Sequence, residues 1–196
     1  MQALIVVDAQ NEFSAEGQRA VPDHLQALEA IRGHVAQARR EGRPIAWVRH
    51  HNRPHESSAF VPGSWGAELS PGLGVESGHG PERLFEKDVY GAFTRTGLEE
   101  WLRGLAVTEV LIVGFYAHMC VSTSVREALV RDFDVVVDPD ATGARDLDHP
   151  VLGHQTADEV RRSALLQLVN MGATVMRPER GASPSPMVAD VASSAA

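Results

Sequence analysis

The 196-residue sequence contains a single cysteine, so it cannot form an internal disulfide bond. It also lacks any apolar run close to the roughly 20 residues that span a bilayer, and its first ten residues lack the charged start and cleavage site of a signal peptide. The formal net charge is −8, which leaves no broad basic surface for phosphates. These absences predict a cytoplasmic protein with no membrane or nucleic-acid partner.

Length and composition predict one globular domain. With 43% hydrophobic and 22% charged residues, the chain can bury one large core. Residues 181–196 are small, interrupted by proline and free of aromatic side chains, so they cannot bury enough surface to offset the entropy lost on ordering. We therefore expect a domain over residues 1–180 and a disordered tail over residues 181–196.

Apolar segments alternate with stretches of helical period, which is the pattern of repeated βαβ units. The expected strands are residues 3–8, 44–50, 83–88, 109–115, 133–138 and 173–176. Two expected helices begin with capping-box pairs, Thr96 with Glu99 and Thr156 with Glu159. Residues 51–82 have no sustained period and predict a long loop. The expected fold is α/β, a doubly wound, mostly parallel six-stranded sheet with helices on both faces.

The single cysteine, Cys120, follows an expected strand and lies at the start of an expected helix. There the helix dipole and the unpaired amides favour a thiolate, although a small buried apolar role is the alternative. Asp8 and Lys87 end two other expected strands. Alone, each could be a turn acid or a solvated edge lysine. Because the carboxyl ends of parallel strands form the ligand crevice of an open sheet, we expect the three groups to meet there.

Several ordered motifs resemble the isochorismatase-like cysteine hydrolases, which include nicotinamidases, N-carbamoylsarcosine amidohydrolases and ureidoacrylate hydrolases. These motifs are ALIVVDAQNEF at the start, AFVPGSWGAEL at 59–69, EKDVYGAF at 86–93 and GFYAHMCVSTSVREA at 114–128. The resemblance implies a Rossmann-like sheet and assigns the family's catalytic residues to Asp8, Lys87 and Cys120. It also implies a cis peptide bond between Phe115 and Tyr116, and a homo-oligomer, either a dimer or a tetramer.

The resemblance and the residue chemistry together predict hydrolysis of a C–N bond in a small amide, ureide or carbamoyl compound, through a thioester on Cys120. Asp8 would accept the thiol proton and pass it to the departing nitrogen, while Lys87 would stabilise the thiolate and keep Asp8 ionised. The backbone amides of Cys120 and of Tyr116 or Ala117 would form the oxyanion hole. No cofactor is expected.

Aromatic residues just beyond the strand ends are candidates for the substrate pocket, because aromatic side chains line many small-ligand sites. They are Phe13, Trp65, Tyr90 and Phe93, and His118 is added as a neighbour of the cysteine. For Phe93, packing in the core is the alternative.

Histidines at positions 50, 51 and 55 invite a metal interpretation. The resemblance argues against it, because metal-dependent nicotinamidases place an aspartate in this region and His50, His51 and His55 have none beside them. We therefore predict no bound metal. A second departure from the family pattern is Ala117, where most members have threonine or serine.

Two other functions remain open from the sequence. An isochorismatase-type vinyl-ether hydrolase would use Asp8 as a general acid and would not need Cys120. A catalytically inactive member would serve in binding or redox sensing. The joint presence of Asp8, Lys87 and Cys120 favours the amide hydrolase over both.

Overall fold

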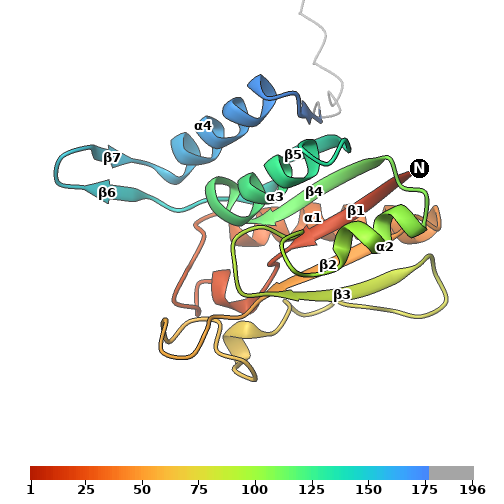
Figure 1. Cartoon of the computed structure of the whole chain (residues 1–196). Coiled ribbons are helices and arrows are strands. Elements are labelled where there is room, and N and C mark those ends of the chain that lie inside the picture. Colours follow the sequence, from red (N-terminus) through yellow and green to blue (C-terminus); the bar gives the residue numbers. More distant parts are fainter. Residues whose placement is uncertain (177–196) are drawn as a thin grey trace, which may run out of the picture.

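The structure is a computed structural model that describes residues 1–176. At its centre six parallel strands pair in the order β3-β2-β1-β4-β5-β8 (Figure 1). The strands are β1 (Gln2–Val7), β2 (Ile45–His50), β3 (Glu82–Lys87), β4 (Glu109–Phe115), β5 (Asp134–Gly143) and β8 (Thr174–Val175). This arrangement confirms the predicted doubly wound α/β fold. The predicted tail at residues 181–196, like the end of the predicted domain, lies outside the described residues.

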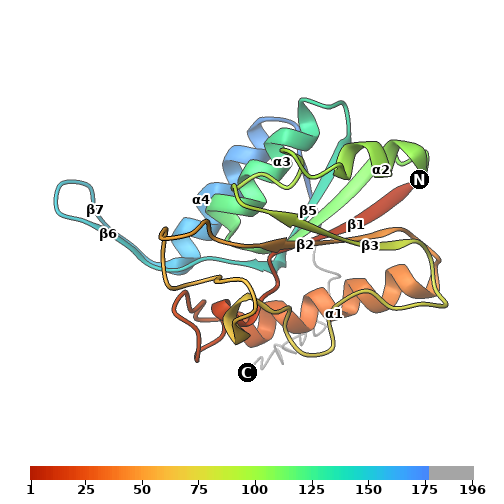
Figure 2. The same ribbon diagram turned by 60° about the horizontal axis from the view of Figure 1, so that its bottom comes forward.

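Helices cover both faces of the sheet (Figure 2). One face carries α1 (His24–Arg40), and the other carries α2 (Leu98–Gly104), α3 (Ser122–Leu129) and α4 (Ala157–Asn170). Three short turns, η1 (Asn11–Phe13), η2 (Trp65–Ala67) and η3 (Ala117–Val121), lie near the carboxyl ends of the strands. Within the described residues, no helix combines the length and apolar character needed to cross a membrane.

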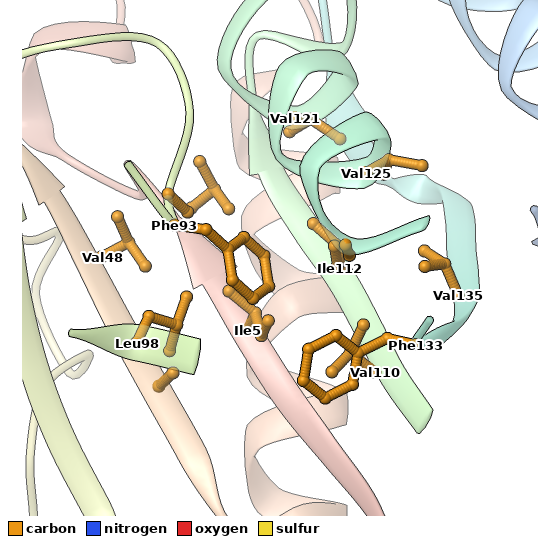
Figure 3. Close-up of a cluster of buried hydrophobic side chains, with 14 of the residues drawn as sticks. Ile5, Val48, Phe93, Leu98, Val110, Ile112, Val121, Val125, Phe133 and Val135 are labelled. Carbon is orange, nitrogen blue, oxygen red and sulfur yellow. The ribbon is translucent and has the colours of Figure 1, made fainter. Parts of the chain in front are cut away.

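The core has two halves because both faces of the sheet are buried. In β1, Ile5 belongs to the cluster under α2 and α3, whereas Leu4 and Val6 belong to the cluster under α1. Figure 3 shows the first cluster, in which Ile5 lies near Phe93. Strands buried on both faces read as continuous apolar runs, which is why the sequence located them so well.

A two-stranded hairpin, β6 (Leu147–His149) and β7 (Gly153–Gln155), projects from the body of the molecule (Figures 1 and 2). Its strands pair with each other and join no strand of the central sheet. At its tip, Val151 and Leu152 are 83% and 85% exposed. This hairpin is not apparent from the sequence, because its two three-residue strands show no apolar alternation.

One of the two predicted capping boxes is confirmed and the other is wrong. Thr156 caps α4, with reciprocal hydrogen bonds between Thr156 and Glu159. The first helix after β3 instead begins at Leu98, after Gly97 in a left-handed conformation with φ of 74°. Thr96 lies one residue before the N-cap position, so its hydroxyl accepts from the Leu98 amide at 3.3 Å and donates to the Ala92 carbonyl at 2.6 Å instead of pairing with Glu99.

Gly114 allows the end of β4 to lie tightly against the end of β1. Its φ is 121°, and a Cβ atom there would lie 1.9 Å from the Val7 carbonyl oxygen. Only glycine tolerates both the conformation and the close approach. The contact places the segment that follows Phe115 beside Asp8, the residue that follows Val7.

Candidate active site

Asp8 and Lys87 meet although one strand separates their own strands. Asp8 directly follows β1 and has a φ of 52°, while Lys87 is the last residue of β3 and lies in register with His50 of β2. The Lys87 ammonium reaches past the end of β2 and donates from Nζ to Asp8 Oδ2 at 2.7 Å. The lysine and aspartate side chains are 0% and 1% exposed, so this ion pair is shielded from water.

The ion pair keeps Lys87 charged. Burial by itself lowers the pKa of the Lys87 ammonium, but Asp8 and Cys120 more than offset this and raise the pKa above its ordinary 10.5. Lys87 therefore remains protonated at neutral pH. The second carboxylate oxygen, Asp8 Oδ1, is buried and has no hydrogen-bond partner among residues 1–176. That oxygen is available to accept a proton.

Cys120 lies in the turn η3, two residues before α3 begins at Ser122, and it is 8% exposed. Burial raises the pKa of its thiol above the ordinary 9.0; the Asp8 carboxylate adds to the rise and Lys87 opposes it. This direction is opposite to the lowering of the thiol pKa that the helix-start position predicts. The dipole argument assumed a solvated helix start, whereas here desolvation dominates and the thiol stays protonated at neutral pH.

The segment before the cysteine is held from several sides. The Phe115–Tyr116 peptide bond is cis. The Tyr116 carbonyl accepts from the amides of Met119 and Val121 at 3.1 and 3.2 Å, and these two residues flank Cys120. The Tyr116 ring packs edge-on against Phe13, with centroids 4.8 Å apart. The segment is thus anchored on both sides of the cysteine; the oxyanion role of its amides stays a prediction.

A cavity of about 300 Å³ opens above these groups. Of the predicted site residues, Asp8, Phe13, Tyr90, Tyr116 and Cys120 line it. The other lining residues were not predicted as pocket residues; they are Arg19, His50, Asn52, Glu56, Ser57, Phe60, Met119 and Arg145. Most of them lie in irregular segments, where no periodic pattern shows which way a side chain faces.

Three predicted pocket residues do not line the cavity. Trp65 is 52% exposed and borders a separate surface hollow. Its backbone carbonyl accepts a hydrogen bond from the Asn11 side chain. Phe93 packs in the core against Phe133, with centroids 5.9 Å apart, so the alternative reading was right. His118 stacks on Tyr116 with ring centroids 5.2 Å apart, and burial, with a contribution from Arg145, lowers its pKa to about 4.

His50 belongs to the site although the sequence analysis treated it only as a metal candidate. It ends β2, and Gln10 fixes its backbone by donating to the His50 carbonyl and accepting from the His50 amide, both at 2.9 Å. Its Nδ1 lies 3.3 Å from Lys87 Nζ and its Nε2 lies 2.9 Å from Asn52 Oδ1. Its position at a strand end, like that of Lys87, was a signal that could have found it.

The three nearby histidines do not converge on one point. His50 faces an ammonium group, His51 Nδ1 lies 3.9 Å from Glu86 Oε1, and His55 is exposed. Within residues 1–176, no three side chains of the metal-binding types gather as a candidate site. An ammonium group beside an imidazole nitrogen does not fit a shared metal ion.

The composition of the site is itself unusual for this chain. The 18 basic residues include one lysine, Lys87, and the sequence contains one cysteine, Cys120. Both lie against the same carboxylate, Asp8, which pairs with the lysine and raises the pKa of the thiol. A thiol that shares a cavity with a buried acid, which is itself paired with an ammonium group, forms a site suited to nucleophilic chemistry with proton transfer.

Residues 2–179 match the Isochorismatase domain, so the chain belongs to the isochorismatase family of hydrolases. A secreted isochorismatase effector of Verticillium dahliae is 33% identical over 74% of this chain and 73% of its own length. Nicotinamidase 3 of Arabidopsis thaliana is 29% identical over 71% of this chain and 72% of its own length. The crystal structure of N-carbamoylsarcosine amidase from Thermoplasma acidophilum has a TM-score of 0.74 at 27% identity, and the match covers 90% of this chain and 95% of that one.

Proposed function

We propose that this protein is a cysteine-dependent hydrolase that cleaves a C–N bond in a small amide, ureide or carbamoyl compound through a thioester on Cys120. The observation that carries the proposal is that Asp8 and Cys120 line one cavity, while the buried Lys87, which does not line it, holds Asp8 with Nζ 2.7 Å from Oδ2. Two relatives support the type of bond, because their names describe an amidase and a nicotinamidase.

In the first step, the protonated thiol of Cys120 gives its proton to Asp8 as the sulfur attacks the substrate carbonyl carbon. The unpartnered Oδ1 of Asp8 suits this role, because Oδ2 is already held by Lys87. The Lys87 ammonium stabilises the sulfur anion as it forms and holds the aspartate in position. The thiol thus loses its proton to Asp8 in the same step in which the sulfur attacks.

The backbone amides of Cys120 and of Tyr116 or Ala117 stabilise the oxyanion of the tetrahedral intermediate. Asp8 then returns the proton to the nitrogen as the C–N bond breaks, and the amine or ammonia leaves. Water attacks the thioester carbonyl, with Asp8 accepting a proton again. The acid product departs, and the Cys120 thiol is restored.

A direct test is a panel of small amides, ureides and carbamoyl compounds assayed for release of ammonia or amine. Intact-mass spectrometry during turnover should show the mass of the acyl group added to the protein, and the adduct should be absent from Cys120→Ala. Turnover without any adduct on a slow substrate, or hydrolysis of none of the panel, would contradict the proposal.

We also propose that the protein forms a homo-oligomer through the β6–β7 hairpin. A two-stranded hairpin alone is marginally stable in water, and this one exposes Val151 and Leu152 at its tip. A second copy of the chain would cover the tip. Light scattering should give a multiple of the 21.2 kDa chain mass, and the double substitution Val151→Ser, Leu152→Ser should reduce it. A monomeric wild type would contradict this.

A further inference from the structure

The cavity carries charged groups that the proposed mechanism does not use. Arg19, Arg145 and Glu56 line it together with Asp8 and Cys120. Since Asp8 is already neutralised by Lys87, the remaining charges are two guanidinium groups and one carboxylate. This local positive excess stands out in a chain whose net charge is −8.

The backbone of Arg19 is held next to the reacting groups. Its amide donates to the Glu12 carbonyl at 3.1 Å, and its own carbonyl accepts from the Tyr116 hydroxyl at 2.5 Å. The buried Glu12 carboxylate also accepts from the Gln18 amide at 2.6 Å. These hydrogen bonds hold the backbone around Arg19 against Tyr116, in the segment that precedes Cys120.

The sheet places Arg145 on the same cavity from another direction. The end of β5 pairs in register with β4 at Gly143 and Phe115, and the buried Ala144 follows. Arg145 comes next and is exposed to the cavity. Burial raises the pKa of Tyr116 to about 12 against the opposing charges of Arg145 and Arg19, so both guanidinium groups act on that hydroxyl.

Neither arginine has an acidic partner in the described part of the chain. None of the ion pairs formed by residues 1–176 includes Arg19 or Arg145. His118 is neutral at pH 7, since its pKa is about 4, and adds no charge of its own. Guanidinium groups bind carboxylates through two parallel hydrogen bonds, which gives both affinity and orientation.

We propose, on the basis of the proposed hydrolase function, that the substrate carries a carboxylate, which Arg19 and Arg145 bind while the amide, ureide or carbamoyl carbonyl faces Cys120. With Glu56 counted, these three lining residues leave one excess positive charge, which matches a single acid group. Arg19 and Arg145 are then specificity-determining residues, and they take no part in proton transfer.

The test compares acid and neutral ligands of the same size. Ammonia release is measured with succinamate, which carries one carboxylate, and with succinamide, in which a neutral amide replaces it. We expect a higher kcat/KM for succinamate. Arg19→Gln and Arg145→Gln should each lower that value by about 10- to 100-fold, because a charge-assisted hydrogen bond is lost, and should lower the value for succinamide much less. The matched control is Arg162→Gln, which removes an exposed arginine outside the cavity.

Binding separates this proposal from the hydrolase itself. Calorimetric titration of the wild-type protein with succinate and with succinamide measures binding without turnover. We expect succinate to bind more tightly than succinamide, and Arg145→Gln to remove that difference. This result would support the carboxylate site even if neither amide is hydrolysed. The comparison extends to acids and their neutral counterparts with chains of three to six carbons. Equal binding and equal turnover of the acids and the neutral compounds across this series would overturn the proposal. So would a failure of every acid in that series to bind, or an equal loss for both ligand classes in the arginine variants.

Discussion

Lys87 donates to Asp8 across the end of β2 at 2.7 Å, with both side chains shielded from solvent. Removing the lysine leaves a buried, unpaired carboxylate. We expect Lys87→Met to lower the free energy of unfolding by about 3–5 kcal/mol and to abolish turnover. Urea unfolding at pH 7 measures the loss. The matched control is Arg95→Met, whose exposed pair with Asp88 at 2.7 Å should contribute less than about 1 kcal/mol.

The same pair predicts a pH dependence of stability. Since the folded-state pKa of Lys87 is raised, its stabilising contribution is fully present below the ordinary value of 10.5 and is lost as the pH rises above it through the folded-state pKa. The difference in unfolding free energy between wild type and Lys87→Met should therefore narrow in strongly alkaline solution. A difference that stays constant or widens there would contradict the assignment.

The Cys120 thiol should react as an unusually weak acid. We expect the half-maximal rate of iodoacetamide alkylation to lie above the ordinary pKa of 9.0, because burial and Asp8 oppose ionisation. Asp8→Asn should lower that midpoint, and Lys87→Met should raise it. The protein unfolded in urea supplies the reference for a free thiol. A wild-type midpoint below this reference would restore the thiolate interpretation drawn from the sequence.

Activity should survive chelation. His50 faces Lys87 and Asn52 rather than His51 and His55, so the three rings cannot hold one ion. Turnover measured with and without EDTA should agree, and added Zn²⁺ should not raise it. Loss of turnover in EDTA that Zn²⁺ or Mn²⁺ restores would show that the histidines bind a metal.

Gly114 should tolerate no side chain. In Gly114→Ala the new Cβ would meet the Val7 carbonyl oxygen at 1.9 Å with φ at 121°, so we expect a loss of about 3 kcal/mol or more in stability. The control is Gly33→Ala in α1, where a Cβ meets nothing within 4 Å and should stabilise the helix by about 0.5–1 kcal/mol. Thermal unfolding of the two variants should shift in opposite directions. A neutral Gly114→Ala would contradict the packing described between β4 and β1.

The sequence predicted the strands and the three central residues because both follow from the sheet. Strands buried on two faces are uninterrupted apolar runs, and parallel strands bring residues at their carboxyl ends, such as Asp8 and Lys87, to one edge. The loop residues were harder to place. Trp65 and Phe93 carry similar apolar surface, yet one faces solvent and the other the core, and no local pattern distinguishes them.

Two properties of the site depend on contacts distant in sequence. Burial is the main cause of the raised pKa of Cys120, and burial cannot be deduced from the position of the cysteine at a helix start. Arg19 and Arg145 reach the same cavity from segments 126 positions apart (145 − 19). Arg145 enters through a β5 that runs beyond its predicted end at residue 138, to Gly143.

The central claim is that Cys120 is the nucleophile and Asp8 its proton acceptor, and kinetics of the two single variants and the double variant test it most directly. On the best substrate, Cys120→Ala and Asp8→Asn should each lower kcat by about a thousandfold or more, and the double variant should lose little beyond either, because residues that act as one unit are strongly non-additive. If Cys120→Ala keeps most of the activity while Asp8→Asn abolishes it, the thiol mechanism is wrong and Asp8 acts alone as a general acid, as in vinyl-ether hydrolysis.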